Sequence, residues 1–220
     1  MNSVFVTGTD TEVGKTRLSV ALVELLQQQG KKIAVMKPVA SGCDMTADGL
    51  RNDDAMKLRQ QADVDVAYDV VNPYAFAPAI APHIAAKQAN IEIDLDVIAQ
   101  HFELIQSQAD AVVVEGAGGW LVPINSTQTM ADLAQSLALP VVLVVGIRLG
   151  CINHALLTVE AIKQSGLVLS AWVANNVEEN PQSAEIIATL EQAISAPLLG
   201  EVPYLSAQQN AVDYLNVEKL

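Results

Sequence analysis

The first thirty residues of this chain read as a strand, a glycine-bounded loop and a helix in immediate succession. Apolar strand formers at residues 4–6 lead into a loop that contains Gly8 and Gly14, and from Lys15 onward apolar residues recur with helical spacing until Gly30. Backbone N–H groups of such a loop, together with the positive end of the helix dipole, surround phosphate oxygens. The sequence therefore predicts a binding site for a nucleoside triphosphate.

The residues at the end of this loop have the chemistry that such a site needs. Lys15 can reach the β and γ phosphates, and the Thr16 hydroxyl can ligate Mg²⁺. The loop is unusual, because five residues separate Gly8 from Gly14 where four are usual. We therefore place the phosphate contacts at Gly14, Lys15 and Thr16, and assign Gly8 to the end of the strand. A chance occurrence of these three residues is the alternative, but the strand and the helix on either side disfavour it.

Length and composition exclude several classes of protein. The chain has 220 residues, which fits one α/β domain over residues 1–220. Its net charge of −13 disfavours a nucleic-acid partner, because phosphate backbones are bound by basic faces. Cys43 and Cys151 are too few for a disulfide framework or a zinc cluster. The longest apolar runs, such as residues 140–146, are too short for a membrane span, and no secretory segment precedes the first strand, so we predict a cytoplasmic protein.

Predicted strands and helices alternate along the chain. The strands are nearly continuous apolar runs, expected at residues 3–8, 32–37, 111–115, 141–146, 169–175 and 198–202. The helices are expected at residues 15–29, 50–62, 94–108, 130–138, 151–165 and 183–194. Residues 66–93 read as one long irregular stretch. This alternation predicts a doubly wound, mostly parallel sheet with helices on both faces and a ligand at the carboxyl ends of the strands.

Two charged residues follow predicted strands at that edge. Lys37 ends the second strand, where Pro38 stops the pairing, and is a candidate anion clamp; a solvated lysine is the alternative. Glu115 ends the third strand, where enzymes with a phosphate loop hold Mg²⁺ or its coordinated water; a capping or surface acid is the alternative. Gly116, Gly118 and Gly119 follow, and three glycines in four residues let the backbone approach a ligand closely, which favours a functional role for this acid.

Two further groups have both a functional and a local explanation. A cluster of Arg51, Asn52, Asp53 and Asp54 opens the helix after the second strand, and either acid could complete the metal shell, although such a charged cluster is more often an N-cap. Asn175 ends the fifth strand. Its amide matches the Watson-Crick face of adenine, but a local turn explains it equally well.

Motifs in register along the chain resemble those of the dethiobiotin synthetase family, ATP-dependent enzymes with a P-loop fold. They are GTDTEVGKT, KPVASG, RNDDA, VNPYAF with APHIAA, VVVEGAGGW, PVVLVVGIRLGCINHA, WVAN and PLLGEVP. The resemblance weakens only after about residue 205. In this family CO₂ adds to an amine of 7,8-diaminononanoate, the carbamate attacks the γ-phosphate of ATP, and the second amine closes a ureido ring. The resemblance implies ATP as co-substrate and Mg²⁺ as cofactor.

The resemblance also assigns roles to residues. It implies catalytic roles for Lys37, Lys15 and Thr11. It implies Mg²⁺ ligation by Thr16, Asp54 and Glu115. The nucleotide site would comprise Glu12, Val13, Gly14, Lys15, Thr16, Arg17, Asp54, Glu115, Gly116, Ala117, Gly118, Asn175, Asn176, Pro203, Tyr204 and Leu205. The substrate site would comprise Thr11, Lys37, Ser41, Gly150, Cys151, Ile152 and Asn153.

Family members are homodimers, so the resemblance implies a substrate site at a subunit interface. The substrate carboxylate would lie against Gly150, Cys151, Ile152 and Asn153 of the neighbouring subunit. This turn opens a predicted helix, whose free N–H groups and dipole suit an anion.

Two other classes of protein share the predicted fold. A partitioning or targeting ATPase would carry a signature lysine five residues before the loop lysine, where this chain has Asp10, and glycines where it has Thr11 and Glu12. A glutamine-dependent amidotransferase would need a further domain with a cysteine nucleophile, and 220 residues leave no room for it. Both alternatives are therefore disfavoured.

Overall fold

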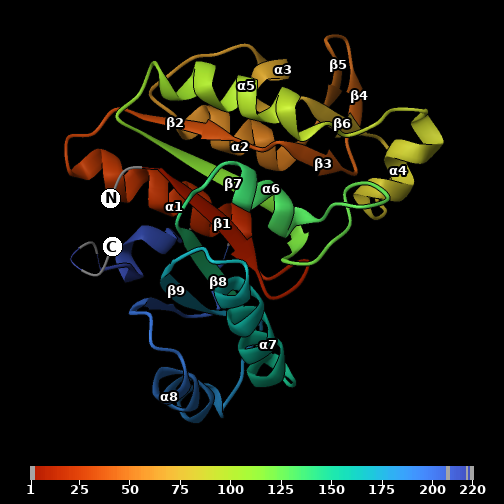
Figure 1. The fold of residues 1–220 in the computed structure, drawn as a ribbon. Coiled ribbons are helices and arrows are strands. Elements are labelled where there is room, and N and C mark those ends of the chain that lie inside the picture. The colour runs from red at the N-terminus through yellow and green to blue at the C-terminus, as the bar shows by residue number, and fades with distance from the viewer. Residues whose placement is uncertain (1–2, 207–208, 217, 219–220) are drawn as a thin grey trace.

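A six-stranded parallel sheet forms the centre of the protein (Figure 1). The computed structural model describes residues 3–206, 209–216 and 218. In spatial order the strands are β10 (Leu198–Val202), β9 (Leu169–Asn176), β8 (Val141–Ile147), β1 (Val4–Gly8), β7 (Ala111–Gly119) and β2 (Ile33–Met36). Every residue of β1, β2 and β8 is buried, because helices cover both faces of the sheet. The predicted parallel sheet is confirmed.

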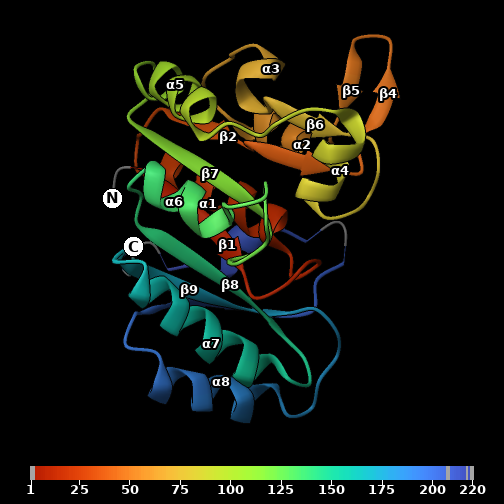
Figure 2. The same cartoon turned by 45° about the vertical axis from the view of Figure 1, so that its right-hand side comes forward.

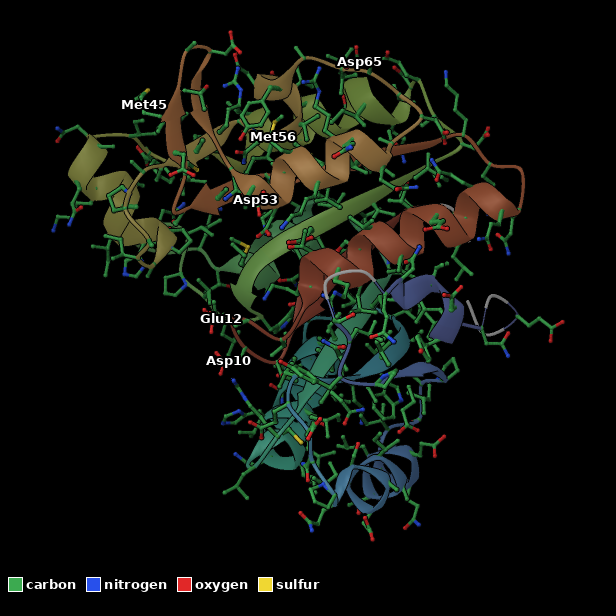
Figure 3. All side chains as sticks on the ribbon, turned by 180° about the vertical axis from the view of Figure 1, so that it is seen from behind. Asp10, Glu12, Met45, Asp53, Met56 and Asp65 are labelled. Carbon is green, nitrogen blue, oxygen red and sulfur yellow. The ribbon has the colours of Figure 1, made fainter. Side chains whose placement is uncertain are left out.

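Helices lie on both faces, as doubly wound folds require. One face carries α1 (Lys15–Gln28), α2 (Asp53–Gln61) and the short 3₁₀ helix η1 (Ala211–Tyr214) (Figure 3). The other carries α5 (Leu95–Gln106), α6 (Met130–Ser136) and α7 (Cys151–Gln164), with α8 (Ser183–Ala193) packed beside α7 (Figure 2). The chain leaves β1 toward β2, and the later crossovers run the opposite way. The winding therefore reverses at β1, where ligands bind in such sheets.

The prediction of an irregular stretch over residues 66–93 is wrong. This stretch contains α3 (Tyr68–Val71), β6 (Tyr74–Phe76) and α4 (Pro82–Ala89). Pro82 occupies the first turn of α4, where a missing N–H costs nothing, so this proline starts a helix instead of breaking one. Strand β6 pairs in parallel with β3 (Val39–Ser41), which continues the chain after β2.

The second predicted helix begins later than expected. Residues 50–51 belong to β5 (Gly49–Arg51), which forms an antiparallel hairpin with β4 (Asp44–Thr46). Helix α2 starts only after Asn52, whose side chain accepts a hydrogen bond from the main-chain N–H of Ala55 at 3.1 Å. The capping explanation for this cluster is thus confirmed for Asn52.

Strand β7 is longer than predicted and is bulged near its carboxyl end. Val6 of β1 lies opposite Glu115 and Gly8 lies opposite Gly119, so β7 uses more residues than β1 over the same distance. Gly118, with φ +62°, lies in this bulge, in a conformation that favours glycine. The bulge leaves Glu115 beside the centre of β1, close to the loop that follows it.

Two negative observations concern the described part of the chain. Cys43 and Cys151 are both buried free thiols. Every helix of the described segments is too short or too polar to span a bilayer.

Candidate functional site

The side chain of Asn175 stabilises the conformation of the loop between β1 and α1. Gly14 is the N-cap of α1 with φ +87°, and a Cβ at this position would collide with the side-chain amide of Asn175. That amide donates from Nδ2 to the main-chain oxygen of Val13 at 2.8 Å. Asn175 therefore supports the phosphate loop, a role that sequence analysis missed, and a contact between Asn175 and adenine stays a prediction.

Lys15 at the start of α1 is almost completely buried. Its Nζ donates to the main-chain oxygen of Asp10 at 2.8 Å, in the loop that Asp10 and Glu12 mark in Figure 3. Burial, and after it the nearby Lys37 ammonium, lower the pKa of Lys15 to about 8. Lys15 therefore begins to lose its proton at a pH only slightly above neutral.

We expect nucleotide affinity to be constant below about pH 8 and to fall by up to tenfold per pH unit above it. The protonated lysine is the form that attracts phosphate oxygens, and binding above pH 8 must first restore its proton. Calorimetric titration of ADP in buffers of different ionisation enthalpy should show proton uptake above pH 8. A Lys15→Met chain should bind weakly and without this pH dependence. Constant affinity of the parent up to about pH 9.5 would contradict the assignment.

Lys37 and Glu115 form a buried ion pair next to this loop. The Lys37 Nζ lies 2.6 Å from Glu115 Oε1 and donates to the main-chain oxygen of Gly116 at 3.0 Å. The Thr16 hydroxyl donates to the same Glu115 oxygen at 2.9 Å. Lys37 is 4% exposed and Glu115 is fully buried. Lys37 is thus not a solvated strand-end lysine, and Glu115 is not a surface acid.

Of the two acids that open α2, only Asp54 faces this pair. The Asp54 Oδ2 lies 3.7 Å from Lys37 Nζ. Asp53, labelled at the start of α2 in Figure 3, instead forms an exposed ion pair with Lys57 one helical turn later. The structure therefore distinguishes two acids that the residue pattern left equivalent and of which the resemblance named Asp54.

The predicted metal ligands fit Mg²⁺ by their chemistry. The second oxygen of Glu115, Oε2, is buried and has no hydrogen-bond partner among the described residues, so it is an unused acceptor. Asp54 and Thr16 line the same cavity as Glu115. The described ranges contain no group of three or more His, Cys, Asp and Glu side chains that could hold a metal ion, so this site has two carboxylates and a hydroxyl to offer. Two carboxylates and a hydroxyl suit Mg²⁺, which keeps water and phosphate oxygens in its remaining positions.

A cavity of about 750 Å³ opens over this cluster. Twelve predicted site residues line it: Thr11, Glu12, Gly14, Lys15, Thr16, Arg17, Lys37, Ser41, Asp54, Glu115, Ala117 and Gly118. The remaining lining was not predicted: Ala40, Asn52, Ala79, Ile80, Ala81, Pro82 and Val122. Ser41 brings a buried hydroxyl with no partner among the described residues, so it can bond a ligand. The unpredicted wall is mainly apolar.

A second cavity, of about 640 Å³, lies at the carboxyl ends of β9 and β10. Asn176, Pro203 and Tyr204 line it, together with Glu178, Glu179, Asn180, Pro181, Ser183, Glu201 and Tyr214. Leu205 is buried, and its main-chain oxygen accepts from the Arg17 guanidinium at 3.2 Å. Arg17 thus ties the segment expected to hold adenine to the helix of the phosphate loop.

The turn at the start of α7 lies outside both cavities. Gly150 is its N-cap with φ +89°, Cys151 is buried, and Asn153 is exposed. Just before it, Arg148 forms an ion pair of 2.6 Å with Asp10 of the phosphate loop. We call Lys37, Glu115, Asp54 and Thr16 the Lys37 cluster. Within one chain, therefore, the structure does not bring the residues of this turn into contact with the Lys37 cluster.

Structural comparison shows the fold alone. The MinC:MinD cell division complex of Aquifex aeolicus has a TM-score of 0.59 at 15% identity, over 93% of this chain and 82% of that chain. The signal recognition particle receptor FtsY of Elizabethkingia anophelis has a TM-score of 0.55 at 15% identity, over 99% and 63%. Both likenesses support a P-loop α/β architecture. At this identity neither supports a switch ATPase over an enzyme.

Sequence comparison is far more specific. A family profile described as AAA domain matches residues 2–212. "ATP-dependent dethiobiotin synthetase BioD" of Pseudomonas aeruginosa (strain UCBPP-PA14) is 52% identical over 207 residues, which cover 93% of this chain and 91% of that protein. The protein of the same name from Vibrio campbellii (strain ATCC BAA-1116) is 47% identical, over 100% and 98%. The predicted resemblance is confirmed: the chain belongs to this AAA-domain family and, within it, to the ATP-dependent dethiobiotin synthetases.

Proposed function

We propose that this chain converts 7,8-diaminononanoate, CO₂ and ATP into dethiobiotin, ADP and phosphate, and that the cavity over Lys37 is where this occurs. Family membership supports the reaction. The observation that carries the choice of site is the buried pair of Lys37 and Glu115, 2.6 Å apart, beside the phosphate loop. It gathers positive charge and metal-binding oxygens where the γ-phosphate of a bound nucleotide would lie.

The reaction needs positioned charge and no covalent nucleophile from the protein. A neutral amine of the substrate adds to CO₂ and forms a carbamate. A carbamate oxygen attacks the γ-phosphorus, ADP leaves, and a carbamic-phosphoric anhydride results. The second amine then attacks the anhydride carbon, and phosphate departs with the former carbamate oxygen. Each step moves negative charge among oxygens, which fixed cations stabilise effectively.

The residues of the cavity suit these steps. Lys15 and Lys37 stabilise charge on the transferring phosphoryl group and on the carbamate, and Thr11 contacts the reacting substrate from the loop. Thr16, Asp54 and Glu115 would hold Mg²⁺, which neutralises phosphate charge when it is bound.

The linings of the two cavities suit the diamine and the base of the nucleotide. The apolar wall that includes Ile80, Pro82 and Val122 suits the methylene chain of the diamine, and the Ser41 hydroxyl faces its polar end. The second cavity, with Asn176, Pro203 and Tyr204, suits a flat base, because the half-exposed Tyr204 offers an aromatic ring there. A cytoplasmic location and the absence of nucleic-acid and membrane partners stay predictions.

The substrate carboxylate belongs, in this proposal, to a site completed by a second copy of the chain. The turn at Gly150 offers free N–H groups at the start of a 14-residue helix and lies outside both cavities of its own chain. Leu149, next to this turn in the chain, is 99% exposed. A homodimer in which each turn serves the partner's cavity would bury this apolar side chain.

Mixing two inactive variants tests this composite site. A Lys37→Ala chain and an Asn153→Trp chain should each be inactive with the diamine. After subunit exchange, activity should recover to about a quarter of the parent level, because half of the dimers are mixed and half of their sites are intact. No recovery, despite exchange shown by mass spectrometry, would mean that each substrate site lies within one chain.

The proposed reaction predicts strict coupling of substrates. Phosphate release from ATP should require both the diamine and a carbon source, and a ureido product should appear in equal amount. Phosphate release that is unchanged when the diamine is omitted would contradict the proposal.

A further inference from the structure

A buried chain of hydrogen bonds lies directly behind the Lys37 cluster. The Asn72 side chain donates from Nδ2 to the main-chain oxygen of Lys37 at 2.6 Å. Its Oδ1 accepts from the Tyr68 hydroxyl at 2.9 Å. The same hydroxyl accepts from the main-chain N–H of Asn52 at 2.7 Å. These contacts connect the end of β2, helix α3 and the start of α2.

The two ends of this chain are the backbone segments that carry Lys37 and Asp54. At one end, Asn52 caps the first turn of α2, the turn in which Asp54 stands. At the other end, the Lys37 main chain is fixed twice, because its N–H also donates to the main-chain oxygen of Val71 at 2.9 Å. A shift of either segment would change the 3.7 Å separation of the Lys37 and Asp54 charges.

The hydrogen-bond chain is built to be rigid. Tyr68 and Asn52 are each 6% exposed, and Asn72 is 2% exposed. The Arg51 guanidinium carbon lies 4.2 Å from the centre of the Tyr68 ring, which fixes the ring by a cation–π contact. Burial raises the pKa of the Tyr68 hydroxyl, so this group keeps the proton that it donates to Asn72. A buried network whose members are all paired holds its geometry strongly.

We propose that Tyr68 and Asn72 are positioning residues that hold the Lys37 main chain against the first turn of α2, and so place the Lys37 ammonium between Glu115 and Asp54. Neither residue lines the cavity, so both act through Lys37. The inference rests on the proposed function, because it assumes that Lys37 acts in turnover. It assigns a purpose to two buried polar side chains that no step of the reaction uses.

A pair of tyrosine variants tests the inference. Tyr68→Phe removes one hydroxyl and should lower kcat by roughly tenfold, because small displacements of a charged group act strongly on turnover. Nucleotide affinity should change by less than about twofold, since the phosphate loop is untouched. Tyr74→Phe is the matched control. Its hydroxyl also accepts a main-chain N–H, that of Asp94 at 3.0 Å, but it lies outside the cavity lining, so kcat should not change.

A double variant separates positioning from general loss of structure. In a Lys37→Ala background, Tyr68→Phe should lower the remaining kcat by less than about twofold, because the group that it positions is gone. A purely structural role would give the same tenfold loss in both backgrounds and would overturn the inference. An unchanged kcat in Tyr68→Phe alone would also overturn it. A Lys37→Ala chain with normal turnover would instead contradict the proposed function, and with it this inference.

Discussion

Lys37→Ala is expected to lower turnover by on the order of a hundredfold or more, the effect of removing one preorganised electrostatic donor from a transition state. Lys37 is nearly buried, so its charge acts with little screening by water. The loss should appear in kcat when ATP and diamine are both saturating. Stopped-flow measurement of phosphate release gives this quantity directly.

An exposed lysine provides the control for this change. Lys57→Ala removes the same charge from α2, where Lys57 pairs with the exposed Asp53, and should leave turnover unchanged. Circular dichroism should show that the Lys37→Ala chain is folded at the assay temperature. Turnover near that of the parent in folded Lys37→Ala would remove this residue from the mechanism.

Glu115→Gln is expected to lower both stability and metal dependence. The substitution keeps the size of the side chain but leaves the buried Lys37 ammonium without its partner at 2.6 Å. Breaking a buried ion pair in this way costs about 3–5 kcal/mol of unfolding free energy. For a chain of this length each kcal/mol lowers Tm by roughly 2–4 °C, so thermal unfolding should show the change clearly.

Two further variants separate the fold from the metal site. Asp54→Asn changes a side chain that is 42% exposed, so it should cost less than about 1 kcal/mol while still weakening activation by Mg²⁺. Adding Lys37→Met to Glu115→Gln removes the unpaired charge and should restore much of the lost stability. Equal losses of stability in Asp54→Asn and Glu115→Gln would contradict the buried pair. Unchanged Mg²⁺ titration in either acid variant would exclude that acid as a ligand.

The parts of the fold that the sequence predicted are those with a strong local signal. Buried parallel strands such as β8 are continuous apolar runs, and their order along the chain dictates the crossovers. The elements within residues 66–93 were missed because each is only three to eight residues long. Strand β6 forms because it pairs with β3, and no local sequence pattern reveals this tertiary contact.

The residues of the candidate site likewise divide into those with a strong local sequence signal and those without one. Lys15, Lys37 and Glu115 were identified because they stand at the ends of predicted elements. The residue pattern did not distinguish Asp53 from Asp54, and only the resemblance named Asp54, because a difference of one residue in helix phase decides which acid faces Lys37. Tyr68 was not predicted to matter because its partner at the start of α2 is a main-chain N–H. Almost every residue has this group, so it leaves no signal in the sequence.

The path of one oxygen atom tests the central claim most directly. If a carbamate oxygen attacks the γ-phosphorus, CO₂ labelled with ¹⁸O should deliver one labelled oxygen to each phosphate released and one to the ureido carbonyl. Mass spectrometry of the phosphate after a single rapid turnover, before CO₂ exchanges with water, measures this transfer. The proposed chemistry predicts labelled phosphate in equal amount to the product. Unlabelled phosphate alongside a labelled product would show that the carboxyl group is not activated by phosphoryl transfer and would contradict the claim.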